Sequence, residues 1–361
     1  MRVHRTTTRT ALLAAAALSL VLAACGGAEE EAEAPAPAPA ATEEAAEEPE
    51  EAAEEPREPV FLSFATGGTG GAYYPYGGAL ANLLEQNLDW VTTTVEATGA
   101  SVENLRLLDS GDAEVVHVQA DAIFRAYNGT GPFEEDGPIA VRTLISKYPN
   151  IMQLLTTDSS IATYEDLAGK RVSVGAAGSG VELTLGGLMV VLGDDYSIFG
   201  QTLNLSYNDQ TSAFRDDQID VGNYQGALGL AAATDLASTN PVTAVSFTEE
   251  QIAAIMAELP YHKPGIIPAG TYNGIDEDVL TPALWNFVAV SADMDRELAY
   301  LITKLAYENQ DALIAGHPQG ANTTLDNVLN AVVPFHPGAI DYFLEVGLEI
   351  PDELYPEEWT E

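Results

Sequence analysis

Three glycine-rich turns hold the residues of this sequence that are best suited to bind a small anion. They read Thr-Gly-Gly-Thr-Gly-Gly at residues 66–71, Thr-Gly-Ala-Ser at 98–101 and Ala-Ala-Gly-Ser-Gly at 176–180. Backbone N–H groups at a turn that opens a helix are unpaired and lie at the positive end of the helix dipole, where a carboxylate or phosphate binds. One such turn indicates only tight packing, whereas three in one chain favour a ligand site.

The sequence lacks the signatures of the common catalytic and metal sites. No Gly-Lys-Ser/Thr follows any of the turns, and residues 67–71 lack the spacing of a dinucleotide fingerprint. The glycines beside Ser179 are one position away from those of a nucleophile elbow. Four histidines are not paired at ligand spacing, and we interpret each as a surface or packing residue: His117, His262, His317 and His336. We therefore predict a binding protein with no catalytic residue, metal or cofactor.

The elements that position these turns follow an alternating pattern. Apolar, β-branched runs at residues 60–65, 92–96 and 171–175 predict strands, and each is followed by a turn and a helical pattern. The three predicted helices carry apolar residues at helical spacing near residues 80–88, 102–108 and 181–192. Such alternation predicts α/β layers with parallel strands, in which ligands bind at the carboxyl ends of the strands.

The charge balance limits the possible partners. The 361 residues include 55 acidic and 14 basic side chains, which gives a net charge of −41 at pH 7. Binding to nucleic acid or anionic lipid needs clustered lysine and arginine, so no nucleic-acid partner is expected. A 46% hydrophobic content supplies material for a buried core, and the single cysteine excludes an intramolecular disulfide.

The N-terminal residues resemble a lipoprotein signal. Arginines at positions 2, 5 and 9 precede an apolar run at residues 11–22, and the sequence Leu-Ala-Ala-Cys ends at Cys25. This resembles the lipobox of bacterial lipoproteins, which implies cleavage after residue 24 and lipidation of Cys25. Residues 25–59 are nearly all Ala, Glu and Pro, and we expect them to form a disordered linker. The chain would then be extracytoplasmic and would contact the membrane through its lipid anchor only.

Six further motifs resemble the TAXI family of solute receptors for TRAP transporters. They lie in the same order as in that family and extend over most of the sequence after the linker, at residues 66–75, 96–105, 127–133, 166–175, 267–272 and 336–339. The resemblance implies an α/β fold of the type II periplasmic-binding-protein architecture, with two lobes and a ligand cleft between them. It further implies lobe one at residues 60–150, lobe two at 151–264, and a return to lobe one with C-terminal helices at 265–361.

The same resemblance implies a function and its partners. Family ligands are small organic anions, chiefly glutamate and other amino acids or C4 to C5 carboxylates. The receptor is not an enzyme; it is a monomer that closes around the ligand and delivers it to the TRAP membrane permease. Two alternatives stay open on the sequence alone, a sensory lipoprotein that uses the same clamp and, less favoured, a surface hydrolase on an α/β scaffold.

The predicted ligand-binding residues come from both lobes. Lobe one supplies Gly70, Gly71, Tyr73, Thr98, Ser101, Gln119, Asp121 and Tyr148. Lobe two supplies Gly178, Ser179, Gly180, Glu182, Tyr224 and Gln225. Two positions depart from the family pattern, because Leu228 stands where a proline is usual and Ala100 where glycine is common. A side chain at residue 100 changes how closely the second turn approaches a ligand.

Overall fold

A computed structural model of the chain describes residues 57–360. The predicted signal at residues 1–24, Cys25 and the linker up to residue 56 lie outside the described residues. Arg57 is already attached to the folded body, because its guanidinium pairs with Glu297 at 2.6 Å and lies 5.1 Å from the centroid of the Trp90 ring. Within residues 57–360, no helix is long and apolar enough to cross a membrane.

The first sheet has the order β10-β11-β3-β1-β2, and β4 pairs with β11 outside that path. Its strands are β1 (Val60–Ala65), β2 (Val91–Glu96), β3 (Val115–Gln119), β4 (Val141–Ile151), β10 (His262–Ile267) and β11 (Val279–Ser291). As predicted for β1 and β2, β1 runs parallel to β2, and it also runs parallel to β3; β11 is antiparallel to its neighbours. We call residues 57–151 and 262–360 the first lobe.

Helices pack around this first sheet. The N-terminal half of the lobe supplies α1 (Tyr73–Asn87), α2 (Ser101–Ser110) and α3 (Ala120–Asn128). The C-terminal part supplies α8 (Arg296–Glu308), α9 (Gln310–Gly316) and α10 (Pro337–Glu345). The helix α8 ends at Glu308 because Asn309 leaves the helical conformation, with φ −121° and ψ 45°.

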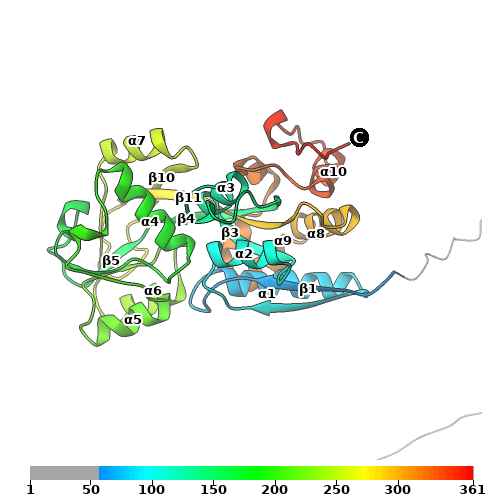
Figure 1. Ribbon diagram of the computed structural model, residues 1–361. Coiled ribbons are helices and arrows are strands. Elements are labelled where there is room, and N and C mark those ends of the chain that lie inside the picture. The colour runs from blue at the N-terminus through cyan, green and yellow to red at the C-terminus, as the bar shows by residue number, and fades with distance from the viewer. Residues whose placement is uncertain (1–56, 361) are drawn as a thin grey trace, which may run out of the picture. The chain divides into compact units, whose positions relative to one another are not determined.

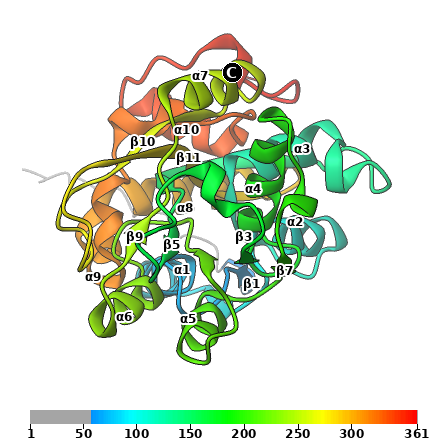
Figure 2. The same ribbon diagram turned by 90° about the vertical axis from the view of Figure 1, so that its left-hand side faces the viewer.

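The second sheet is made by the middle of the chain, with the order β7-β6-β8-β5-β9. Its strands are short: β5 (Leu154–Thr156), β6 (Arg171–Ser173), β7 (Gln201–Leu203), β8 (Val221–Asn223) and β9 (Thr243–Ala244). Its helices are α4 (Gly180–Val191), α5 (Tyr207–Arg215), α6 (Ala231–Thr239) and α7 (Glu249–Glu258), which surround the strands in Figure 2. We call residues 152–261 the second lobe.

The chain passes between the lobes twice. It leaves the first sheet after β4 and returns to it through β10, and in Figure 1 these strands lie between the green second lobe and the blue and orange first lobe. One apolar core, which contains Tyr148 and Leu230, continues from the first lobe into the second. The α/β class predicted from the sequence is confirmed, and the lobe boundaries stay a prediction.

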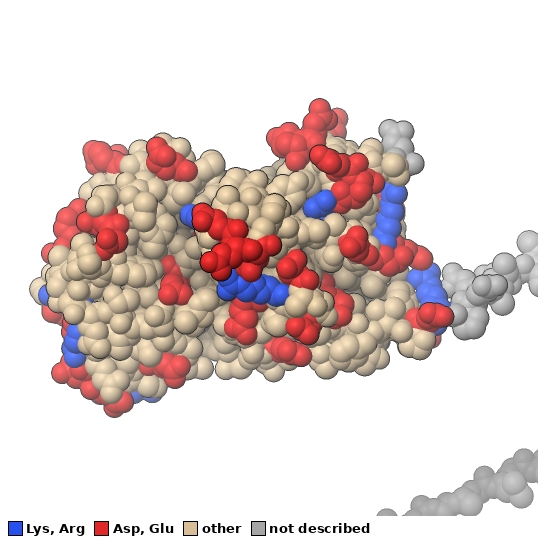
Figure 3. All heavy atoms as spheres, viewed as in Figure 1, with Lys and Arg blue, Asp and Glu red and all other residues tan. Residues whose placement is uncertain are grey.

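Acidic side chains cover much more of the surface than basic ones on the face drawn in Figure 3. Within residues 57–360, most lysines and arginines that are not buried are paired, as Arg215 is with Asp235 and Arg296 with Asp341, both at 2.6 Å. Exposed pairs of this kind contribute little stability each. The folded body therefore presents a negative field to its surroundings.

Ala100 has a backbone conformation that favours glycine, with φ 76° and ψ −146°. A β-carbon in that region costs on the order of 1 kcal/mol or more. We expect Ala100→Gly to raise the free energy of unfolding by about 0.5 to 1 kcal/mol, because the strain relieved exceeds the entropy that glycine adds to the unfolded chain. Urea unfolding at neutral pH measures this difference, and an unchanged or lower unfolding midpoint would contradict it.

Candidate functional site

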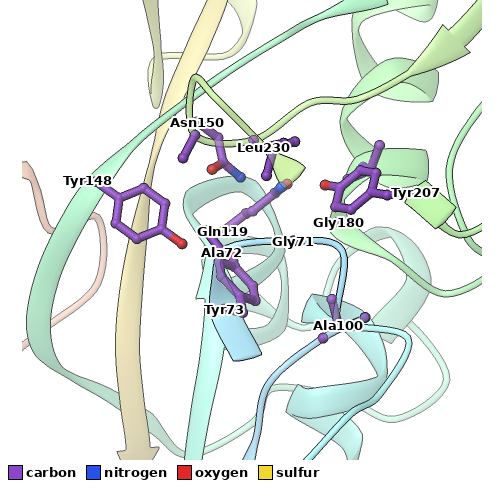
Figure 4. Close-up of a pocket in the computed structure, with 15 residues that line it drawn as sticks. Gly71, Ala72, Tyr73, Ala100, Gln119, Tyr148, Asn150, Gly180, Tyr207 and Leu230 are labelled. Carbon is purple, nitrogen blue, oxygen red and sulfur yellow. The ribbon is translucent and has the colours of Figure 1, made fainter. Parts of the chain in front are cut away.

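A small cavity lies between the two lobes, where the carboxyl ends of β1 and β3 face the first turn of α4. The space that the centre of a water molecule can occupy is about 40 Å³. Most of its wall is backbone and small or apolar side chains: Gly67, Gly68, Gly71, Ala72, Ala100, Gly180, Val181, Gly226, Ala227 and Leu230. Its polar side chains are Tyr73, Gln119, Tyr148, Asn150 and Tyr207, of which Figure 4 shows the arrangement. The wall contains no lysine, arginine, aspartate or glutamate.

The first turns of several helices meet at this cavity. The residues that precede α1, α2 and α3 are Ala72, Ala100 and Gln119, and all three line the wall. No N-cap side chain bonds any of these three helices. Some first-turn N–H groups are already paired, as Glu103 N–H is with the Gly178 carbonyl at 3.3 Å and Ala122 N–H with Asp121 Oδ1 at 2.7 Å, and the remaining ones keep their hydrogen-bonding capacity. Gly180 brings the start of α4 to the same place from the second lobe. Four partial positive charges therefore converge on one small, uncharged space, which suits an anion.

Tyr148 and Asn150 supply side-chain polar groups to the cavity from β4. Both are buried, and the Tyr148 hydroxyl makes no hydrogen bond within the described part of the chain. Burial raises the pKa of Tyr148 well above its ordinary value, so this hydroxyl stays protonated and can donate. A buried hydroxyl without a partner is expensive unless something binds it, so the Tyr148 hydroxyl is free to donate to a molecule in the cavity.

The two lobes touch through polar groups beside the cavity. The Thr184 hydroxyl on α4 lies 2.5 Å from Asp121 Oδ2 and 3.1 Å from Gln119 Oε1, both on the first lobe. Gln225 Nε2 donates to the same hydroxyl oxygen at 3.2 Å. A β-carbon at Gly180 would come within 2.6 Å of Gln119 Oε1, so glycine permits this close approach. The contact between the lobes is therefore polar and depends on a missing side chain.

Asp121 holds its proton more tightly than an exposed aspartate. Burial raises its pKa to about 6, and the hydrogen bond from Thr184 opposes this only in part. The Thr184 hydroxyl has one proton, while Asp121 Oδ2, Gln119 Oε1 and the Gly180 carbonyl all lie within hydrogen-bonding distance of it. A protonated Asp121 supplies a second donor to this group of oxygens and so favours the contact between the lobes.

Five of the predicted ligand-binding residues line the cavity: Gly71, Tyr73, Gln119, Tyr148 and Gly180. Others from the first lobe lie beside it and bond within the protein. The Ser101 hydroxyl accepts from the Gln119 backbone N–H at 3.1 Å, and Thr98 donates to Asn104 at 2.5 Å. Gly70 faces Asn208 instead, and Asp121 contacts Thr184 behind the wall.

Of the remaining predicted residues of the second lobe, Ser179, Glu182 and Tyr224 bond within their own lobe. The Gly178 carbonyl accepts from the Glu103 backbone N–H of the first lobe at 3.3 Å. Glu182 accepts from the Gly178 backbone N–H at 2.9 Å and from Asn204 at 2.8 Å, and the Ser179 hydroxyl caps α4. Tyr224 is fully buried and its hydroxyl lies 3.0 Å from that of Thr211. Gln225 reaches the contact between the lobes and not the cavity wall. That these residues contact a ligand stays a prediction. Ser179 and Glu182 hold the turn before α4 in place.

Sequence reasoning missed two polar residues of the wall, Asn150 and Tyr207. Asn150 is a buried amide near the end of β4, but that strand also contains Thr143, Ser146 and Lys147, so the sequence does not single it out. Tyr207 is the first residue of α5, after the capping Ser206, and its hydroxyl donates to the carbonyl of Gln225. Nothing in the local pattern places the start of α5 beside the cavity.

Comparison with known proteins gives a family and several similar structures. The sequence profile of the NMT1-like family matches residues 64–347. The aliphatic sulphonate-binding protein SsuA from Escherichia coli shares 15% identity over 80% of this chain and 83% of its own, with a TM-score of 0.44. A TRAP periplasmic solute-binding protein from Pseudomonas aeruginosa with bound L-malate shares 10% over 80% and 91%, with a TM-score of 0.43. The methionine-binding protein MetQ shares 13% over 73% and 96%, with a TM-score of 0.40.

The raised pKa of Asp121 predicts a pH-dependent stability. The folded pKa of about 6 exceeds the ordinary 3.8, so the folded state binds more protons and its stability falls as the pH rises through about 6. We expect Asp121→Asn to remove this fall, which amounts to at most about 3 kcal/mol between pH 4 and pH 7.5. Urea unfolding at both pH values, with exposed Asp293→Asn as control, measures it. Equal pH dependence of the wild type and Asp121→Asn would contradict the assignment.

Proposed function

The chain belongs to the NMT1-like family, and we propose that it is an extracytoplasmic solute-binding receptor that captures a small organic anion between its lobes and delivers it to a TRAP-type membrane permease. The TAXI-like motifs at residues 66–75, 96–105 and 166–175 support the TRAP assignment. The first two contain the turns that precede α1 and α2, and the third ends immediately before the turn that precedes α4. The role is capture and release without chemistry on the ligand.

The observation that carries this proposal is the convergence of uncapped helix starts on a space with no charged side chain. Ala72, Ala100 and Gln119 precede three such helices, and Gly180 begins a fourth helix, α4, which the Ser179 hydroxyl caps. An acidic side chain in the wall would repel an anion, and the wall contains no aspartate or glutamate. Backbone N–H groups are fixed before the ligand arrives, so they bind a carboxylate without reorganisation.

The size of the cavity supports capture by closure. About 40 Å³ holds roughly one or a few water molecules, whereas glutamate or a C4 to C5 dicarboxylate is larger. The lobes must therefore separate to admit such a ligand. The polar contact among Gln119, Asp121 and Thr184 can open into water at low cost, because each group exchanges one hydrogen bond for another. Affinity then arises when both lobes close on the ligand.

The proposal includes a lipid anchor at Cys25 and a spacer up to residue 59, as the lipobox and the Ala/Glu/Pro composition predict. A sensory lipoprotein that passes the same closure to a signalling partner is the alternative. Both functions need only the cavity and a docking face. Genes for TRAP membrane subunits beside the gene for this chain favour transport, and a neighbouring sensor kinase favours sensing.

A thermal-shift screen tests the ligand class. The purified protein is heated with L-glutamate, L-glutamine, 2-oxoglutarate, succinate or L-malate, and with glucose as an uncharged control. A ligand at one hundred times its Kd stabilises the folded state by about 2.7 kcal/mol, which corresponds to a rise in Tm of roughly 5 °C. We expect at least one anion to give this rise and glucose to give none. A flat response to every anion would count decisively against an organic-anion receptor.

Gly180 provides a test of closure. We expect Gly180→Val to weaken binding of the anion identified in the screen by roughly tenfold or more, because its side chain would meet Gln119 Oε1 and Ser101 Oγ across the lobes. The matched control is Gly78→Ala on α1, where a β-carbon meets nothing within 4 Å. Isothermal titration calorimetry gives the affinities and circular dichroism confirms folding. Wild-type affinity in a folded Gly180→Val protein would show that the lobes need not close at this residue.

A further inference from the structure

Lys147 is a fully buried lysine directly behind the cavity. It lies on β4, one residue before Tyr148, and no part of it is exposed. Its Nζ lies 2.8 Å from His117 Nδ1 and 3.8 Å from the centroid of the Tyr73 ring. Tyr73 and Tyr148 both line the cavity, so a single aromatic layer separates the Lys147 amine from the space between the lobes.

No carboxylate balances this amine. None of the ion pairs formed within residues 57–360 includes Lys147, although the chain carries 55 acidic side chains. A buried ammonium without a counter-ion costs several kcal/mol, and proteins avoid the cost by pairing the group or by leaving it neutral. The other three lysines of the chain, at positions 170, 263 and 304, are not buried.

The titratable groups that face Lys147 carry no negative charge at pH 7. These groups are His117 on β3, Tyr73 and Tyr76 on α1, Tyr148 on β4 and His317 after α9. Burial lowers the pKa of Lys147 well below its ordinary value, and burial together with Lys147 lowers the pKa of His117. His117 Nε2 also has no hydrogen-bond partner among the described residues. The empty site is therefore short of negative charge.

We propose that Lys147, supported by His117, is the counter-charge of the bound anion and takes up a proton from solvent when the anion enters the cavity. The inference rests on the proposed function, and it names the residue that balances the charge of the anion and the proton that is taken up with it. Negative charge placed beyond the Tyr73 and Tyr148 rings stabilises the ammonium at short range in a medium of low polarity. The rings stabilise it further through cation–π contact.

This arrangement adds selectivity for charge to the site. Helix N-termini bind any group with acceptor oxygens, including the dipole of a neutral amide. An ammonium that forms only when a full negative charge is present favours the anion over its neutral analogue. The receptor would then bind an anion and a proton together, with weaker binding as the pH rises.

Lysine NMR tests the protonation directly, because the chain contains only four lysines. The protein is labelled with ¹³C at lysine Cε, and Lys147→Met assigns the Lys147 signal by its loss. At pH 7.5 we expect this signal at the neutral-amine position in the free protein, and at the ammonium position with saturating L-glutamate, 2-oxoglutarate or succinate. The other three signals should stay at the ammonium position throughout.

The outcomes separate this inference from the receptor function. If an anion raises Tm and perturbs the protein while the Lys147 signal stays fixed, the counter-charge is wrong and the receptor stands. A Lys147 signal that is already charged in the free protein overturns the counter-charge in the same way. If none of the anions binds, the receptor function fails and the counter-charge fails with it.

A variant supplies an independent readout. We expect Lys147→Met, which preserves volume and removes the amine, to weaken anion binding by roughly tenfold or more and to abolish proton uptake. Proton uptake is measured by calorimetry in two buffers of different ionisation enthalpy. Lys170→Met, outside the cavity, should keep both values. A merely structural role for Lys147 would change stability but would leave the number of protons taken up unchanged.

Discussion

The contact between Gly180 and Gln119 is the constraint on which the rest of the site depends. Gly180 begins α4 on the second lobe, and a β-carbon there would lie 2.6 Å from Gln119 Oε1 on the first. Because no side chain separates them, Thr184 reaches Asp121, and the first turns of four helices share one cavity. One apolar core continues from the first lobe into the second, while the contact at Gly180 is polar and small, so this contact can open while the shared core stays packed.

The surface of the protein is negatively charged, whereas its cavity favours a negatively charged ligand. The surface is acidic, as Figure 3 shows for one face, whereas the cavity meets only helix N-termini and polar or apolar side chains. Surface repulsion between an anion and the protein is long-ranged and screened by salt, but the N–H groups act only at contact. The Lys147 amine, the proposed counter-charge of a bound anion, lies against the rings of Tyr73 and Tyr148. Capture of an anion by so acidic a chain would depend on this local field.

Much of the fold and part of the site could be predicted from the sequence. The first predicted strand coincides with β1, and the helix predicted over residues 181–192 begins and ends within one residue of α4. The three glycine-rich turns lie at or beside the cavity, because carboxyl ends of strands and starts of helices are local features. Thr98, Ser179 and Glu182 were assigned to the ligand from type and proximity, yet their side chains stabilise the turns themselves.

The sequence by itself determined the α/β class, the acidic charge, the anion-favouring turns and the family resemblance, since each depends on neighbouring residues or on composition. Only the tertiary structure decided which polar groups face the cavity. Contacts between segments far apart in the chain bring Asn150 and Tyr207 to the cavity wall and Lys147 behind it, and no local pattern encodes such contacts. Burial, which also depends on the whole fold, gives Lys147 and Asp121 their altered pKa values, because it removes the water that would otherwise stabilise their charge.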